Sequence, residues 1–338
     1  AHLPAPPQAV PEAITSVRGG MVSSTTQNAI LGCLVMAVIE KLVKSTLAAL
    51  DIKFPAMLGG CIFLFFSLLV TEKINPDAAA SAFDFLKPGA DLVAKWFSML
   101  FVPGLVLLPL SPSIGSNLEI AKAIMVCVVG FVYTASISAY SVLAIRVAQG
   151  AVKKVALPSV KASSKKVSKP AAPAKPYSAE IVSLFTKLSV TTGLISALAT
   201  RSGNGFAKPI ETIFLCCFTI ASYVWGARLP NAYVKLVHPL VTSSVMVLAV
   251  VRVLGIAAGV DMLDILRNYK TGSFAPMKIG SGDILLYLCG TGVVSFAISM
   301  YSRRALIFSN LPVLATAMLV SSAGSLFSTA AFVRLISL

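Results

Sequence analysis

The chain has 338 residues, of which 57% are hydrophobic and only 12% are charged, and its mean hydropathy is +0.86. Soluble domains carry about 25% charged residues, so this composition excludes an ordinary soluble fold and predicts a protein that uses lipid as its solvent. The formal net charge is +15. Eight cations and no acid lie between Arg146 and Ala179, which favours a loop on the positive side of a membrane over a nucleic-acid surface.

Apolar stretches long enough to cross a bilayer recur along the whole chain, since a spanning helix needs about 20 residues. In chain order they cover residues 28–50, 54–70, 91–111, 122–145, 181–200, 210–227, 238–258, 284–301 and 312–336. We therefore predict an all-α fold, a polytopic helical membrane protein with about nine transmembrane helices in two halves.

Composition divides the chain into four parts. Residues 1–27 open with AHLPAPPQAVPEA, lack the apolar core of a signal peptide and are predicted to be disordered, as expected of a start left by removal of a transit peptide. Residues 28–145 are predicted to form a four-helix membrane domain. Residues 146–179 form a basic linker, rich in Pro, Ala and Lys, that is predicted to be a flexible tether. Residues 180–338 form a second membrane domain of about five helices.

Positive charge near helix ends predicts the orientation of the chain in the membrane. The basic linker marks the positive side, and an even number of helices before it places the N-terminus on that side too. Arg303 and Arg304 fall on the same side, whereas Arg201 and Lys208 fall on the opposite side.

Two breaks in the apolar pattern lie at membrane depth, where broken helices often line substrate cavities. Pro103-Gly104 predicts either a half-helix break at a binding site or a packing kink. Gly290-Thr291-Gly292, hereafter the 290–292 step, lies in the middle of the eighth stretch. Its glycines either expose backbone N–H groups to an anion or let two helices approach closely.

Three ionisable positions are candidates for function, because charge within a membrane is costly. Arg252 lies well inside the seventh stretch and is a candidate for gripping a substrate carboxylate, although it could equally snorkel or pair with an acid. His238, before Pro239, is either a proton relay or an interfacial residue. Glu40, near Lys41 and Lys44, is predicted to belong to an interfacial cluster.

The sequence gives no positive support for an enzyme. It has no G-x-S-x-G, H-E-x-x-H or P-loop motif, and its six cysteines form no C-x-x-C pair. The two histidines, His2 and His238, are too few for a histidine-rich metal centre. No catalytic residue, metal or cofactor is therefore predicted.

Several longer segments resemble known membrane-protein families. The stretch FVPGLVLLPL, which contains Pro103 and Gly104, resembles the LrgA/CidA family. The order HPLVTSSVMVLAVVRVLG, NYKTG and GDILLYLCGTGVVSFAISMYSRR is similar to the LrgB/CidB family, although the 290–292 step stands where that family has Gly-Pro-Ala. The linker and the segments KPYSAEIVSLFTKLSVTTGL and YVWGARLP extend the resemblance, over roughly residues 20–338, to a plastid family in which the two types are fused.

The resemblance implies a carrier that exchanges small hydroxy-carboxylates, glycolate for glycerate, across the chloroplast inner envelope in photorespiration. It implies a small organic anion and the lipid bilayer as partners, no nucleic acid, and leaves homo-oligomerisation open. Substrate contacts are expected among Arg252, Gly290, Thr291, Gly292, His238, Pro103 and Gly104. The alternative is a holin-like, pore-forming or regulatory protein of the LrgA/LrgB type. LrgB-type proteins continue beyond the position of Leu338, so we expect the second half to be incomplete.

Overall fold

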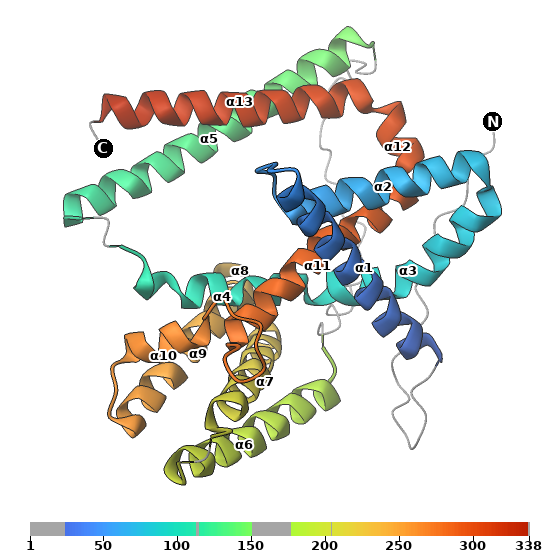
Figure 1. The fold of residues 1–338 in the computed structure, drawn as a ribbon. Helices are drawn as coiled ribbons and strands as arrows, with labels where there is room; N and C mark the ends of the chain where they lie inside the picture. The colour runs from blue at the N-terminus through green and yellow to red at the C-terminus, as the bar shows by residue number, and fades with distance from the viewer. Residues whose placement is uncertain (1–23, 113–114, 151–176, 204, 337–338) are drawn as a thin grey trace, which may run out of the picture.

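The computed structural model describes residues 24–112, 115–150, 177–203 and 205–336, and all regular structure in these ranges is helical. Most of the N-terminal residues that we predicted to be disordered, and most of the linker that we predicted to be flexible, lie outside these ranges. The longer helices (Figure 1) are α1 (Ser24–Ala49), α2 (Ala56–Ile74), α3 (Pro76–Trp96), α5 (Asn117–Ala148), α6 (Ala179–Arg201), α7 (Ala207–Ala227), α9 (Pro239–Ala258), α11 (Ser281–Ser302) and α13 (Leu311–Leu335).

Shorter helices connect these elements. They are η1 (Phe97–Phe101), α4 (Val102–Val106), η2 (Leu108–Leu110), α8 (Asn231–Leu236), α10 (Met262–Tyr269) and α12 (Arg304–Ser309). Within the described ranges, eight helical segments are long and apolar enough to cross a membrane, namely α2, Pro76–Leu110, α5, α6, α7, α9, α11 and α13. The prediction of an all-α polytopic membrane protein is therefore confirmed; α1, which carries three charged residues in its second half, is not among the eight.

The prediction of the third span was wrong in its boundaries. The helix begins at Pro76, after an Asn75 cap whose Oδ1 accepts from the Ala78 N–H at 3.0 Å. The first part of this helix contains acidic and basic residues, so a search for apolar runs did not identify it as helical. The α-helical geometry ends at Trp96, before Pro103, and Pro103 then lies in the first turn of α4, where its missing N–H costs little. The segment is thus broken over several residues rather than kinked at one proline.

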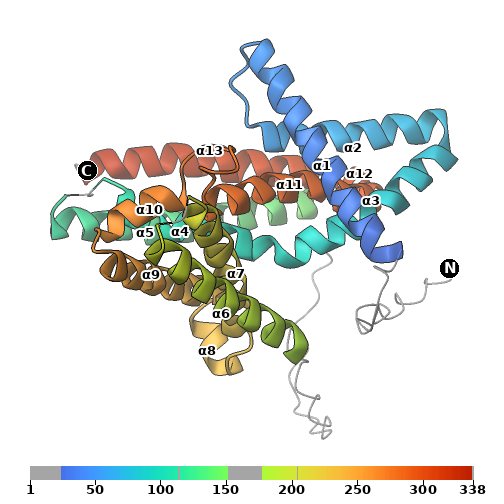
Figure 2. The same ribbon diagram turned by 60° about the horizontal axis from the view of Figure 1, so that its bottom comes forward.

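Helix α11 lies at the centre of the molecule (Figures 1 and 2). It packs against α1, α2 and α3 on one side and against η1 and α7 on the other, so it joins elements from both ends of the chain. More than half of its membrane-length window is buried, which sets it apart from the lipid-facing helices. Small residues permit this close packing, since a Cβ added at Gly60 of α2 would lie 2.8 Å from the Val294 side chain.

Helices α5 and α13 form an antiparallel pair, here called the arm, that extends away from the core (Figure 1). Each has one buried residue, Val126 and Val313, and the remaining apolar side chains are at least partly exposed. The arm contacts the end of α12 through a hydrogen bond of 2.7 Å from the Arg146 guanidinium to Asn310 Oδ1. The start of the linker and the turn after α11 therefore lie close together.

The described chain resumes at Tyr177, near the end of the predicted linker, and this residue is anchored to the core. Its ring lies 5.0 Å from that of Trp96, and its hydroxyl donates to the Lys95 carbonyl at 3.3 Å. Burial raises the pKa of Tyr177 to about 12, so the hydroxyl remains a donor at physiological pH. This contact ties the start of α6 to the end of α3.

Candidate functional site

Glu40 of α1 is buried in the helix packing, with only 9% of its surface exposed. The prediction that it belongs to an interfacial cluster was wrong. The backbone of Glu40 lies against Gly60 of α2, and its carboxyl lies against Gly290 of α11, where any side chain would collide with it. A buried carboxyl group in a membrane protein is costly and points to a function.

The Thr291 hydroxyl is the hydrogen-bond partner of this carboxyl. Thr291 is 1% exposed, and its Oγ1 donates to Glu40 Oε2 at 3.5 Å, at the long end of a hydrogen bond. No described cation forms an ion pair with Glu40, although Lys44 lies one turn further along α1. The 290–292 step therefore both accommodates the carboxyl and supplies its donor.

The chain after α3 consists of the short helices η1, α4 and η2, hereafter the broken segment. This segment packs against the same part of α11. A Cβ at Gly292 would lie 2.5 Å from a ring carbon of Phe97, the first residue of η1. Phe97 also packs edge-on against Phe296, one turn further along α11, with ring centroids 4.8 Å apart. The glycines on either side of Thr291 thus face two different neighbours, the Glu40 carboxyl and the broken segment. Close packing of helices, one of the two predicted roles of these glycines, is what the structure shows.

Pro103 is fully buried, but Gly104 is exposed, and no atom lies within 4 Å of a Cβ built on it. Helix α4, which contains both residues, packs against α9. Within the broken segment, the structure therefore places Pro103 inside the protein and Gly104 on the outside.

Arg252 and His238 lie outside this buried cluster. The Arg252 side chain is exposed and forms no hydrogen bond or ion pair with a described residue. His238 is exposed at the start of α9, where its Nδ1 accepts from the Leu240 N–H at 3.2 Å. His238 is thus a helix cap, which agrees with an interfacial position. The structure does not bring either residue to the 290–292 step.

A second buried polar cluster lies between α7 and α9. The hydroxyls of Ser222 and Ser243 are 2.7 Å apart, and Ser243 also donates to the Thr219 carbonyl at 3.3 Å. These groups satisfy one another, so they stabilise the contact between the two helices. The sequence pattern did not single out these hydroxyls, because serine and threonine are common in membrane helices.

The carboxylate of Asp283 closes the loop before α11. It accepts from the backbone N–H groups of Thr271, Gly272 and Gly280 at 2.8 to 3.0 Å, and also from the Thr271 hydroxyl. Gly272 has a φ of +73°, which favours glycine. This network holds the N-terminal end of α11 in place. It therefore helps to set the position of Thr291 relative to Glu40.

The arrangement can recognise a hydrogen-bonding group, and within the described residues no cation forms an ion pair with its carboxyl. Glu40 and Thr291 supply an acidic oxygen and a hydroxyl, which suit a substrate hydroxyl or a proton. A substrate carboxylate would need a cation from elsewhere. Sequence reasoning missed Glu40 because its neighbours Lys41 and Lys44 suggested a membrane surface; its place in an otherwise apolar run was the available signal.

Comparisons with known proteins agree with this description of a membrane protein. The profile of the LrgB-like family matches residues 219–338, which include α9 and the 290–292 step. The chain is 28% identical over 298 residues to the plastidal glycolate/glycerate translocator 1, chloroplastic, of Arabidopsis thaliana. That match covers 87% of this chain but 55% of the relative, so the chain spans about half the length of the relative. No solved structure matches the chain significantly. The chain is therefore similar to a plant membrane translocator over most of its length and carries an LrgB-like segment in its second half.

Proposed function

We propose that the chain is a non-enzymatic membrane carrier that exchanges small hydroxy-carboxylates, glycolate for glycerate, across the chloroplast inner envelope in photorespiration. The observation that carries the proposal is the similarity to a glycolate/glycerate translocator over 87% of the chain. A match of that length must include parts of both halves of the chain, rather than the LrgB-like segment alone.

The buried cluster is the proposed substrate site. Glycolate and glycerate share a hydroxyl next to a carboxylate, and the pair of Glu40 and Thr291 can hydrogen-bond that hydroxyl. The broken segment adjoins the 290–292 step through Phe97, which fits the broken helices of carriers. Alternating access would then move this segment relative to α11. Arg252, His238 and Gly104 are not part of the proposed site, because their exposed side chains lie outside the cluster.

The alternative is a pore-forming or regulatory protein of the LrgA/LrgB type, which the LrgB-like segment supports only in a general way. A pore passes unrelated solutes and does not need substrate on the far side. A carrier moves labelled glycolate inward faster when glycerate is present inside.

The test is exchange by the purified 338-residue chain in sealed liposomes. We expect uptake of labelled glycolate to depend on internal glycerate, and Thr291→Val to lower the initial rate about tenfold, since one lost hydrogen bond is worth about 1.5 kcal/mol. Thr291→Ser, which keeps the hydroxyl, is the matched variant and should retain most of the rate. Leakage of an unrelated sugar without exchange would overturn the carrier in favour of a pore.

A further inference from the structure

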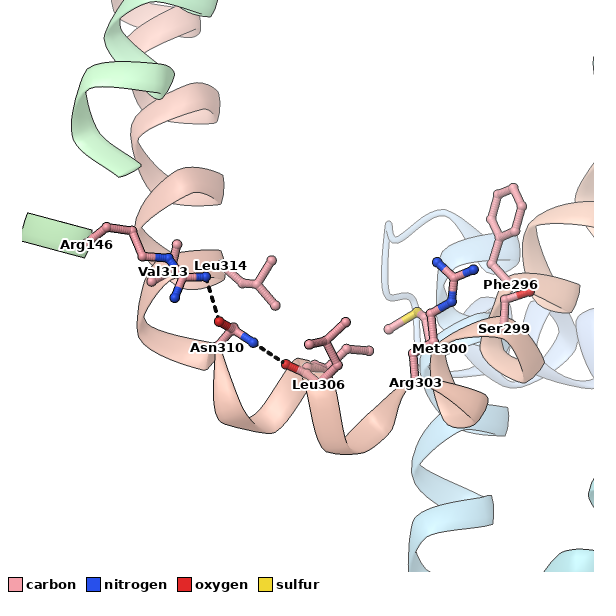
Figure 3. A pocket seen from close by; sticks show the side chains of 10 residues that line it. Arg146, Phe296, Ser299, Met300, Arg303, Leu306, Asn310, Val313 and Leu314 are labelled. Atoms are coloured by element: carbon pink, nitrogen blue, oxygen red, sulfur yellow. Dashed lines mark hydrogen bonds between the residues drawn. The ribbon is translucent and has the colours of Figure 1, made fainter. Parts of the chain in front are cut away.

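A pocket of about 630 Å³ lies where the arm meets the end of the core. It is lined by one residue of α5, by the last turns of α11, by α12 and by the start of α13 (Figure 3). The residues that the argument uses are Arg146, Phe296, Met300, Arg303, Asn310 and Leu314. Glu40 and Thr291 of the proposed substrate site do not line this pocket, and Phe296, whose ring packs against Phe97, lies between the two.

Two arginines supply uncompensated positive charge to the pocket. Arg146 is half-buried and is oriented by Asn310, whose own Nδ2 donates to the Leu306 carbonyl at 2.9 Å (Figure 3). Arg303 lies toward the α11 side of the same pocket. Neither arginine forms an ion pair with a described acid, whereas the adjacent Arg304 is paired with Glu72. An anion in the pocket would supply the missing counter-charge.

The walls between the two arginines are almost wholly apolar. Figure 3 shows Leu314 on the side of Arg146, and Met300 and Phe296 on the side of Arg303. A two- or three-carbon hydroxy acid fills only a small part of such a volume and would meet few hydrogen-bonding groups, whereas pockets of this size hold ligands much larger than that. The combination of separate cations and apolar walls therefore fits an anion that carries a hydrocarbon chain.

The position of the pocket fits a lipid from the surrounding membrane. Arg146 is the first residue of the predicted basic linker, so the pocket lies at the end of the molecule that the charge distribution assigns to the positive side. Basic pockets between transmembrane helices on that side are typical binding places for acidic lipid headgroups. The arm otherwise has little contact with the core, and a bound lipid would fill the space where they diverge.

We propose that this pocket binds an acidic membrane lipid, with its phosphate at the half-buried Arg146 and an acyl chain along Met300 and Leu314. The exposed Arg303 adds positive charge on the other side of the opening. The bound lipid fastens the arm to the core. Binding of the lipid does not depend on the transport function proposed above.

The test is native mass spectrometry of the delipidated full chain with added phosphatidylglycerol or phosphatidylcholine. We expect phosphatidylglycerol to be retained preferentially, and Arg146→Gln and Arg303→Gln each to lower its retention about fivefold. Arg228→Gln is the matched control, because Arg228 is also partly buried but lies outside the pocket. Equal retention of both lipids, or unchanged retention by the double variant, would overturn the proposal.

Two further experiments distinguish the possible explanations of the result. Glycerol 3-phosphate and glycolate should not displace the lipid at millimolar concentration; displacement would mean that the pocket takes free anions instead. If either variant fails to fold, a photoactivatable phosphatidylglycerol is applied to the unaltered chain. Labelling within residues 296–314 is expected, and labelling confined to other segments would refute the site.

Discussion

The contact between Glu40 and Gly290 shows how one side chain decides the packing of two helices. The carboxyl occupies the space that a methyl group at position 290 would need, and Thr291 holds it there. A carboxyl in a low-dielectric interior is tolerated only when its oxygens find donors. The glycine is therefore required by the acid rather than by the backbone conformation of α11.

Gly290→Ala tests this relation at the residue scale. We expect the substitution to destabilise the chain by about 1–3 kcal/mol, because the new methyl group displaces the Glu40 carboxyl from Thr291. In a Glu40→Ala background the same substitution should cost almost nothing, since the space is then free. Unfolding of the four forms in mixed micelles measures the coupling. Equal costs in both backgrounds would show that the two positions are independent.

At the scale of elements, α1 and α3 cross with their backbones in contact. A Cβ at Gly89 would lie 2.7 Å from the Cys33 nitrogen and 2.9 Å from the Ala29 carbonyl oxygen. Neither neighbour is a side chain that can rotate away, so the two helices would have to separate. This crossing positions α1 and hence Glu40.

Gly89→Ala is accordingly expected to destabilise the chain by about 2 kcal/mol, near the middle of the range for overpacked sites. Gly104→Ala is the matched control, because a Cβ at Gly104 meets no atom within 4 Å, and alanine is the better helix former by about 1 kcal/mol. The midpoint of unfolding in detergent should therefore fall for Gly89→Ala and stay level or rise for Gly104→Ala. A fall of the same size in both variants would contradict the close crossing.

The elements that the sequence predicted well are those that hydropathy alone determines. The bounds of α5, α6, α7, α9, α11 and α13 lie within a few residues of the predicted stretches, since length and apolar content suffice to identify a span. The short helices α8, α10 and α12 were missed because they carry no long apolar run. The burial of Glu40 was not predictable from its neighbours, because it depends on a partner 251 residues away in the chain.

Which residues contact substrate stays a prediction. The 290–292 step and Pro103 are buried, whereas Arg252, His238 and Gly104 are exposed. A pattern of residue types marks where polar groups sit along a span, but it does not say which face of the helix points inward. That information comes from the packing of α11 against helices from both halves.

At the scale of the whole molecule, the two predicted halves are joined through packing as well as through the linker. Helix α11 lies among α1, α2 and α3, and α13 pairs with α5. These contacts stabilise the association of the two halves even when the chain is cut, because helices in a membrane associate through packing and hydrogen bonds.

Co-expressed fragments of residues 1–160 and 161–338 are therefore expected to co-purify through a tag on either one. Gly60→Leu should weaken this association, since Gly60 faces Val294 of the other fragment. Gly59→Leu is the matched control, because its neighbours Val43 and Leu47 belong to the same fragment. Fragments that elute separately without any substitution would mean that the linker alone holds the halves together.

The fit between the Glu40 carboxyl and Gly290 also has an evolutionary consequence. A larger residue at 290 would force the Glu40 carboxyl to shift away from Thr291, and a smaller residue at 40 would leave a void beside the glycine. Related chains should therefore show correlated substitution at the two positions. Where the two halves are encoded as separate genes, that correlation would extend across two polypeptides and tie the inheritance of one to the other.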